Sequence, residues 1–200
     1  MAIPMDANDS RGANVAEMTL GAAFPGILAA AQTGAEWAVT ALYQEYDPAL
    51  VRYLRARAGQ DGEDVAAETW LDAARNLAGF SGDEERFRRW LYTIANRRVT
   101  DWLRRGSRRP VAFSSQETLA TQIDGGDTAE LALGRLDADD IARRIATVLP
   151  PAQAEIVLLR VVVGLTVDEV AEVTGRRPGT VRVMAHRALR RLAQELSEDV

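Results

Sequence analysis

Apolar residues between positions 37 and 105 recur at intervals of three and four, the spacing that places side chains on one side of a helix. Leu91, Ala95 and Val99, for example, fall on one stripe. No segment shows the sustained alternation of apolar and polar residues that marks a half-buried strand. The pattern therefore predicts an all-α fold.

Breaks in this pattern divide residues 37–105 into three helical units. The first comprises one or two helices, broken near Asp47-Pro48, because proline interrupts a helix. The second covers residues 61–77, and the third covers 85–105 after a loop at 78–82. In the second unit, four positions are expected to face inward: Val65, Thr69, Leu71 and either Ala74 or Leu77.

Composition divides the whole chain into four parts. Residues 1–35, rich in Ala, Gly and small polar residues, predict a flexible extension with a short helix near Phe24 to Ala31. Residues 36–106 form a first helical domain, and 107–134 an acidic linker with Ser114-Ser115 and Gly125-Gly126. Helical periodicity resumes in a second domain at 135–200, interrupted by Pro150-Pro151. We therefore expect two small helical domains joined by a flexible linker.

Residues 165–196 have the pattern of two short helices joined by a tight turn. Thr166 can cap the first helix, and Glu169 three residues later completes a capping box. Thr174-Gly175 ends that helix, and Pro178 fits the first turn of the next one, where its missing N–H costs nothing. This arrangement predicts a helix-turn-helix.

The second helix of this motif has one apolar side and one basic side. From residue 176 to 191 there are six Arg and no acidic residue. A helix-turn-helix with such a second helix is a candidate for the major groove of DNA. His186 lies on the same exposed side, where a groove contact is favoured over catalysis because no acidic partner lies within a turn.

The net charge of −5 conceals a strong separation of charge. Residues 86–109 contain nine Arg and one acidic residue, whereas residues 111–141 contain seven acidic residues and one Arg. Charges farther apart than a Debye length of about 10 Å are largely screened, so phosphates respond to the local patch. Two basic patches separated by an acidic segment are compatible with two separate DNA contacts.

The first basic patch interleaves arginines with aromatic residues, among them Phe80, Phe87, Trp90 and Trp102. Proteins that bind single-stranded DNA combine such arginines with stacking surfaces or base pockets. The alternative is that the aromatic residues are core and the arginines a solvated face. The acidic residues from Asp61 to Glu68 are similarly open to two interpretations, a docking patch or a helix N-terminus favoured by its dipole.

Several function classes are disfavoured by what the chain lacks. It has no Cys and one His, which excludes thiolate and His-cluster metal sites, and we expect no cofactor. An enzyme is the least favoured class, because no set of nucleophile, base and metal ligands is visible. No apolar run is long enough for a membrane span and no secretory signal is evident, so we expect a cytoplasmic protein without membrane insertion.

Both halves together resemble the extracytoplasmic-function (ECF) sigma factors of the sigma-70 family. The second half resembles region 4 of that family through LPPAQAEIVLLRVVVGLTVDEVAEVTGRRPGTVRVMAHRALRRL. The first half resembles region 2 through DGEDVAAETWLDAARNLAGFSG and RRWLYTIANRRVTDWLRR. The resemblance covers about residues 37–196, in the family's order and spacing.

This resemblance implies a protein that binds core RNA polymerase, through the β′ clamp helices and the β flap, and directs it to promoter DNA. Region 4 would read the −35 element with Arg177, Thr180, Arg182, Val183, His186, Arg187 and Arg190. Region 2 would melt and read the −10 element with Phe80, Ser81, Gly82, Asp83, Arg86, Asn96 and Arg97. Asp64 and Glu68 would dock on the clamp helices, and an anti-sigma factor would be a further partner.

The chain departs from the family pattern at several of these places. Ala67 stands where the family often has Gln, and Arg97 where it often has Asn, with Asn96 one position earlier. Val183 and Met184 replace residues that are often Ser and Arg. These departures bear on the promoter sequence. Other classes also remain open: a stand-alone helix-turn-helix regulator, and a helical interaction module with solvated arginines.

Overall fold

The computed structural model describes residues 20–106 and 137–198, and the regular secondary structure within these ranges is helical. The expected all-α fold is confirmed. The predicted linker at 107–134 and the first 19 residues of the predicted extension lie outside the described residues. The helices are α1 (Phe24–Gln32), α2 (Glu36–Ala58), α3 (Gly62–Asn76), α4 (Glu84–Gly106), α6 (Ala138–Val148), α7 (Pro151–Val157), α8 (Val167–Thr174) and α9 (Pro178–Glu198).

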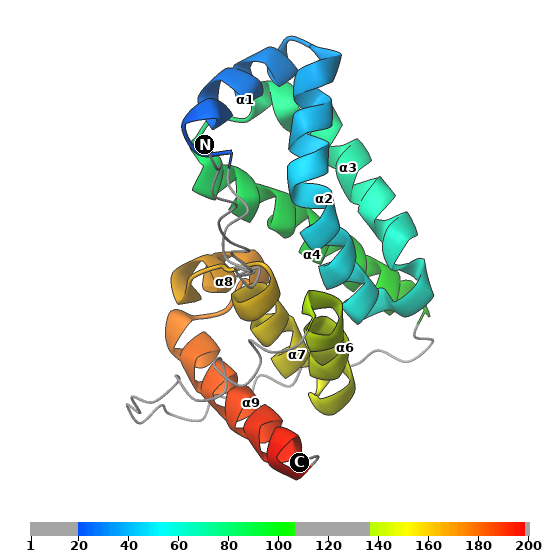
Figure 1. Ribbon diagram of the computed structural model, residues 1–200, viewed down its shortest axis with the longest axis vertical. Helices are drawn as coiled ribbons and strands as arrows, with labels where there is room; N and C mark the ends of the chain where they lie inside the picture. Colours follow the sequence, from blue (N-terminus) through cyan, green and yellow to red (C-terminus); the bar gives the residue numbers. More distant parts are fainter. Residues whose placement is uncertain (1–19, 107–136, 199–200) are drawn as a thin grey trace, which may run out of the picture.

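Helices α1 to α4 form the first domain, in the upper half of Figure 1. Its core joins Phe24 and Leu28 of α1 to Tyr46 of α2 and to Phe87 and Leu91 of α4. The short helix expected near Phe24 to Ala31 is present as α1. It is packed into the domain, whereas the composition of residues 1–35 predicted a flexible extension. Burial of its large apolar side chains gives this helix a stability that small-residue composition does not reveal.

Helix α2 runs without a break through Pro48, contrary to the prediction of an interruption there. The proline ring removes one backbone donor, but Pro48 and Gln44, four residues earlier, are both exposed, so water can satisfy the freed carbonyl. Tyr46, Ala49 and Leu50 around the proline are buried. Their packing on the rest of the domain outweighs the local preference for a break.

Helix α3 packs on α2 and α4 through Val65, Thr69 and Ala73, and Leu77 follows at its end. The inward placement of Val65, Thr69 and Leu77 was therefore predicted correctly. The prediction for Leu71 is wrong, because its side chain is 56% exposed on the opposite side of the helix. That exposed apolar residue lies on the face that also carries Asp64 and Glu68.

Helices α6 to α9 form the second domain, in the lower half of Figure 1. Pro150 and Pro151 separate α6 from α7, and a π-helical turn, η4 (Leu158–Val162), extends α7 toward the helix-turn-helix. Ile145, Ile156 and Leu192 are completely buried where α6, α7 and α9 meet. The domain thus supports the α8–α9 pair on an apolar base.

The two domains are packed against each other, although the sequence predicted separate units on a tether. One cluster of buried residues contains Leu50 and Val99 of the first domain and Ile141, Leu158 and Val173 of the second. The contacts run between α2 and α6, between α2 and η4, and between α4 and α8. Figure 1 shows α8 lying directly beneath α4. Apolar residues that neither domain buries within itself therefore pack together in one core shared by both domains.

Candidate nucleic-acid interface

The helix-turn-helix forms as its local sequence predicts. The Thr166 hydroxyl accepts the N–H of Glu169 at 3.3 Å, and the Glu169 carboxylate accepts the N–H of Thr166 at 2.8 Å, which completes the capping box. Gly175 ends α8 in the left-handed conformation, with φ of 68°, where glycine is favoured. Pro178 begins α9. The capping box, Gly175 and Pro178 thus determine where α8 starts and ends and where the basic helix α9 starts.

Helix α9 buries one side and leaves its basic side accessible. Val181, Ala188 and Leu192 are completely buried, as the spacing predicted. The residues expected to face the −35 element lie on the other side of α9 or in the turn before it. Five of them are exposed and two are half-buried: Arg177, Thr180, Arg182, Arg187 and Arg190, then Val183 and His186.

The loop between α3 and α4 is short and tightly built. Asp83 caps α4, because its side chain accepts the N–H of Arg86 at 2.9 Å and its carbonyl accepts the N–H of Phe87 at 3.0 Å. Gly82 has no space for a side chain, since a Cβ there would lie 2.9 Å from the Cβ of Arg86. Ser81, Gly82 and Asp83 are exposed on the outer side of this turn.

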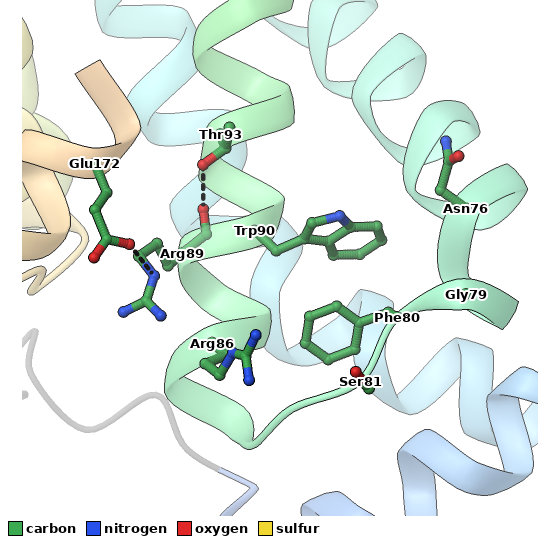
Figure 2. A pocket seen from close by; sticks show the side chains of 9 residues that line it. All are labelled: Asn76, Gly79, Phe80, Ser81, Arg86, Arg89, Trp90, Thr93 and Glu172. Atoms are coloured by element: carbon green, nitrogen blue, oxygen red, sulfur yellow. Dashed lines mark hydrogen bonds and ion pairs between the residues drawn. The ribbon is translucent and has the colours of Figure 1, made fainter. Parts of the chain in front are cut away.

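A pocket of about 660 Å³ opens beside this loop. Figure 2 shows the rings of Phe80 and Trp90 on one side and the side chains of Arg86 and Arg89 close by. The two ring centroids are 5.0 Å apart, and the ring planes are inclined by 38°. The pocket is lined by Asn76, Gly79, Phe80, Ser81, Arg86, Arg89, Trp90, Thr93 and Glu172.

Five of these lining residues were not assigned a role from the sequence: Asn76, Gly79, Arg89, Thr93 and Glu172. For two of them a signal exists, because Arg89 follows Arg86 by three positions and Thr93 follows Arg89 by four, so all three share one face of α4. Glu172 comes from α8 and could not have been placed there from helical spacing. Its carboxylate forms an ion pair with Arg89, with 2.8 Å between Oε2 and Nε, and Glu169 lies 3.5 Å from Arg89 Nη1.

Asn96 and Arg97, both expected to read the −10 element, point in different directions. Arg97 is exposed, but Asn96 is 8% exposed and lies between the two domains. Asn96 Nδ2 donates to the carbonyl of Val173 at 3.3 Å, and its Oδ1 accepts from the Tyr53 hydroxyl at 3.1 Å. In this arrangement Asn96 holds α4 against the end of α8 and is not available to DNA.

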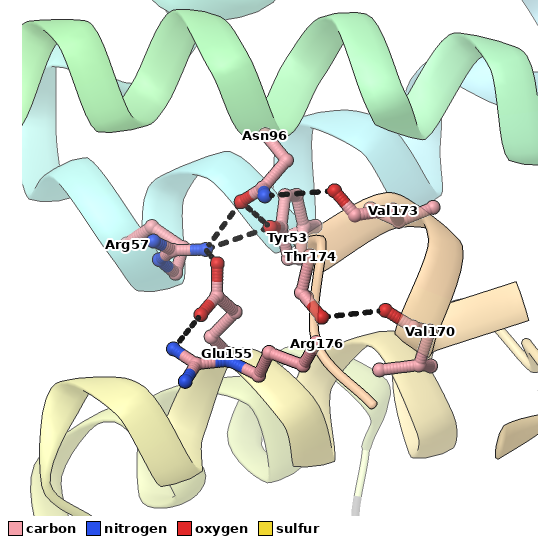
Figure 3. A network of polar contacts seen from close by, with 8 residues as sticks. All are labelled: Tyr53, Arg57, Asn96, Glu155, Val170, Val173, Thr174 and Arg176. Carbon is pink, nitrogen blue, oxygen red and sulfur yellow. Dashed lines mark hydrogen bonds and ion pairs between the residues drawn. The ribbon is translucent and has the colours of Figure 1, made fainter. Parts of the chain in front are cut away.

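Asn96 belongs to a buried polar network, drawn in Figure 3. Arg57 Nη1 donates to Asn96 Oδ1, to the Tyr53 hydroxyl and to Glu155 Oε1, and Glu155 Oε2 accepts from Arg176 at 3.4 Å. Burial disfavours the charged guanidinium, but Tyr53 and Glu155 outweigh this effect and raise the pKa of Arg57. Burial also raises the pKa of Tyr53 to about 12.

The two acidic residues expected to contact polymerase are both exposed on α3. Glu68 lies 3.4 Å from Arg98, which also pairs with Asp72 of the same helix. The hydrogen bond from Arg98 lowers the pKa of Asp72. Asp64, Glu68 and Leu71 are spaced by four and three residues, so they form one outward face.

Two kinds of feature are absent from the described ranges, 20–106 and 137–198. No group of three His, Cys, Asp or Glu side chains is arranged there to hold a metal ion. No helix in those ranges is long and apolar enough to cross a bilayer.

Comparison with known proteins places both domains in one family. Residues 42–109 match the family model for Sigma-70 region 2, and residues 136–192 match that for Sigma-70, region 4. The ECF RNA polymerase sigma factor SigD of Mycobacterium tuberculosis is 34% identical over 178 residues, covering 85% of this chain and 82% of SigD. The chain belongs to the ECF group of the sigma-70 family.

Further similarities agree with this assignment. The ECF sigma factor BldN of Streptomyces coelicolor is 32% identical over 173 residues, which cover 84% of this chain and 64% of BldN. The solved structure of CnrH in complex with the cytosolic domain of CnrY has a TM-score of 0.58 and 25% identity, covering 87% of this sigma factor and 97% of that chain. Helix α1 precedes the residues that match region 2.

Proposed function

We infer that this sigma factor binds core RNA polymerase in the cytoplasm and directs it to promoters, reading the −35 element with α9 and capturing a −10 base beside the 80–83 loop. One observation carries this proposal. A single chain holds both an accessible basic recognition helix and, beside the 80–83 loop of the first domain, a pocket lined by aromatic rings and arginines. The first suits duplex DNA and the second suits an unstacked base.

At the −35 element, α9 would lie in the major groove. Arg182 and Arg187 are exposed on its outer face, and arginine forms paired hydrogen bonds to guanine that contribute about 1–3 kcal/mol of discrimination. Arg177, Arg190 and Thr180 lie on or beside the same face, where Thr180 would approach phosphate. Val183 and His186 are half-buried and would contact the groove through their outer atoms.

At the −10 element, the pocket would take a non-template base once the duplex is melted. Phe80 and Trp90 offer ring faces for stacking, which contributes about 1–3 kcal/mol per base in single-strand binders. Ser81, Gly82 and Asp83 would shape the entrance, while Arg86 and Arg97 would neutralise phosphates. Because Arg89 is paired with Glu172 and Glu169 of α8, DNA would have to displace these carboxylates to reach it.

Partner proteins would use other surfaces. Asp64 and Glu68, together with exposed Leu71, would dock on the β′ clamp helices, and the second domain would meet the β flap. CnrH is bound to the cytosolic domain of CnrY in its structure. We expect a comparable protein partner here, an anti-sigma factor.

Reconstituted transcription tests this function. Core RNA polymerase from a related bacterium is incubated with and without the full chain on a pool of genomic promoter fragments. The expected result is a set of new transcripts, dependent on the chain, whose start sites share two upstream motifs. Tight specific binding of duplex DNA by the chain alone, without such transcripts, would instead identify a stand-alone helix-turn-helix regulator.

A further inference from the structure

The segment at 20–32, which contains α1, is fastened to both ends of the 80–83 loop. At the C-terminal end of α1, Gln32 Nε2 donates to the carbonyl oxygen of Phe80 at 2.7 Å and to that of Leu77 at 3.0 Å. One side-chain amide thus joins the short turn that ends α3 to the first residue of the loop. This contact is made by residues 45 and 48 positions apart in the sequence.

The residues just before α1 are tied to the residue that follows the loop. Glu84 begins α4, and its carboxylate accepts the backbone N–H of Leu20 at 2.6 Å and that of Gly21 at 2.8 Å. The Tyr46 hydroxyl donates to the same carboxylate at 2.8 Å. The loop therefore runs between two anchor points, both of which involve the segment at 20–32.

Apolar packing joins these two anchor points. Phe24 of α1 is 1% exposed, and its ring centroid lies 5.5 Å from that of Phe87. Phe87 is in turn 5.5 Å from Phe80, which lines the pocket. Helix α1 consequently supports the aromatic side of the pocket from within the domain.

We propose that the segment at 20–32 is a brace that holds the 80–83 loop in its base-capturing conformation, with Gln32 as a positioning residue for −10 recognition. This inference rests on the proposed function. Ordering a flexible loop costs free energy that would otherwise contribute to binding. A loop that is already ordered before DNA binds avoids this cost. The Gln32 amide suits this role because two carbonyl oxygens require a donor, which neither Met nor Glu offers at that position.

The test compares two promoters that share a −35 element and differ at the captured −10 base. The ratio of transcripts from the two, measured with the full chain and core polymerase, reports −10 discrimination. A variant that is partly unfolded loses transcripts from both promoters equally and leaves the ratio unchanged. Gln32→Met is expected to lower the ratio about fivefold, the effect of one lost hydrogen-bonding group.

Thr33→Ala is the matched control. Thr33 ends the same helix, but its hydroxyl donates to Ala30 within α1 and not to the loop, so the ratio should stay at the wild-type value. Glu84→Gln, which disturbs the other anchor point, should lower the ratio as Gln32→Met does. An active Gln32→Met protein with the wild-type ratio would overturn the brace alone. A wild-type chain that directs no transcription would overturn the proposed function, and the brace with it.

Discussion

Arg57 and Glu155 form an ion pair between the two domains, with 3.2 Å between Nη1 and Oε1 and side chains only 9% and 7% exposed. The pair is supported by Tyr53 and Asn96 on one side and by Arg176 on the other. Each charge has given up most of its hydration, which is tolerated only when its partners are in place. The network therefore links, through specific polar contacts, two domains that the sequence predicted to be separate.

Replacing Glu155 by Gln should be strongly destabilising. The substitution keeps the shape of the side chain but leaves the buried Arg57 guanidinium without its counter-charge. Breaking a buried pair in this way costs about 3–5 kcal/mol. Urea unfolding of the full chain at neutral pH measures the change in the free energy of unfolding.

Asp140→Asn is the control for this substitution. Asp140 pairs with Arg143 at 2.7 Å, but both side chains are more than half exposed. Solvent-exposed pairs contribute about 0–1 kcal/mol, so this variant should remain close to the wild type. A Glu155→Gln protein as stable as Asp140→Asn would show that the buried network does not fasten the domains.

Removing the carboxylate of Glu172 should make the pocket beside the 80–83 loop more accessible to DNA. Glu172 pairs with Arg89 at 2.8 Å, and its own side chain is 63% exposed, so it lies at the pocket entrance rather than in a core. Loss of an exposed pair of this kind corresponds to a factor of about two to five in affinity. Binding of a fluorescent single strand carrying the −10 sequence to Glu172→Gln should be tighter by that factor.

The same Asp140→Asn variant controls for net charge, because it also removes one negative charge from the second domain. Its affinity for the single strand should match the wild type if the effect is local to Arg89. Equal gains in both variants would mean that Glu172 acts only through overall charge.

Alkaline pH should weaken the fold through its buried tyrosines. The pKa of Tyr53 is about 12 in the folded chain, against an ordinary value of 10.0, so the unfolded chain releases this proton first. Stability is therefore fully present below about pH 10 and is lost as the pH rises toward 12. Burial raises the pKa values of Tyr46 and Tyr92 in the same direction.

Tyr53→Phe separates this effect from the lost hydrogen bond. Near pH 8 the variant should be less stable by about 1 kcal/mol, because the phenol no longer donates to Asn96. Between about pH 10 and 12 its free energy of unfolding should fall less steeply than that of the wild type. Parallel pH profiles for the two proteins would contradict the assignment of a raised pKa to Tyr53.

Features that depend on nearby residues were predicted well from the sequence. The capping box of Thr166 and Glu169 formed as expected, because both partners lie within one turn of helix. Leu91, Ala95 and Val99 are buried, because a single stripe on α4 faces a continuous core. Local spacing was sufficient in both cases, since a helix fixes which residues share a side.

Features that depend on tertiary contacts were not predicted. The family resemblance predicted that Asn96 reads the −10 element, but in the structure Tyr53, Arg57 and Val173 surround it. The sequence did not distinguish Arg89 from the other arginines of α4, because its partner Glu172 comes from α8. The packing of α1 was also missed, because its small residues gave no periodic signal as clear as the stripe of α4.

In the proposed function, α9 reads the −35 element while the first domain reads the −10 element. Arg187→Ala in reconstituted transcription is the most direct test of this assignment. Core polymerase transcribes three templates, with an intact promoter, a substituted −35 element or a substituted −10 element, in the presence of the wild-type chain or a variant. Arg143→Ala on α6 serves as the control for loss of an exposed arginine. We expect Arg187→Ala to lose discrimination at the −35 element, by about 1–3 kcal/mol, and to retain it at the −10 element. Wild-type preferences at both elements in an active Arg187→Ala protein would contradict the placement of α9 in the −35 groove.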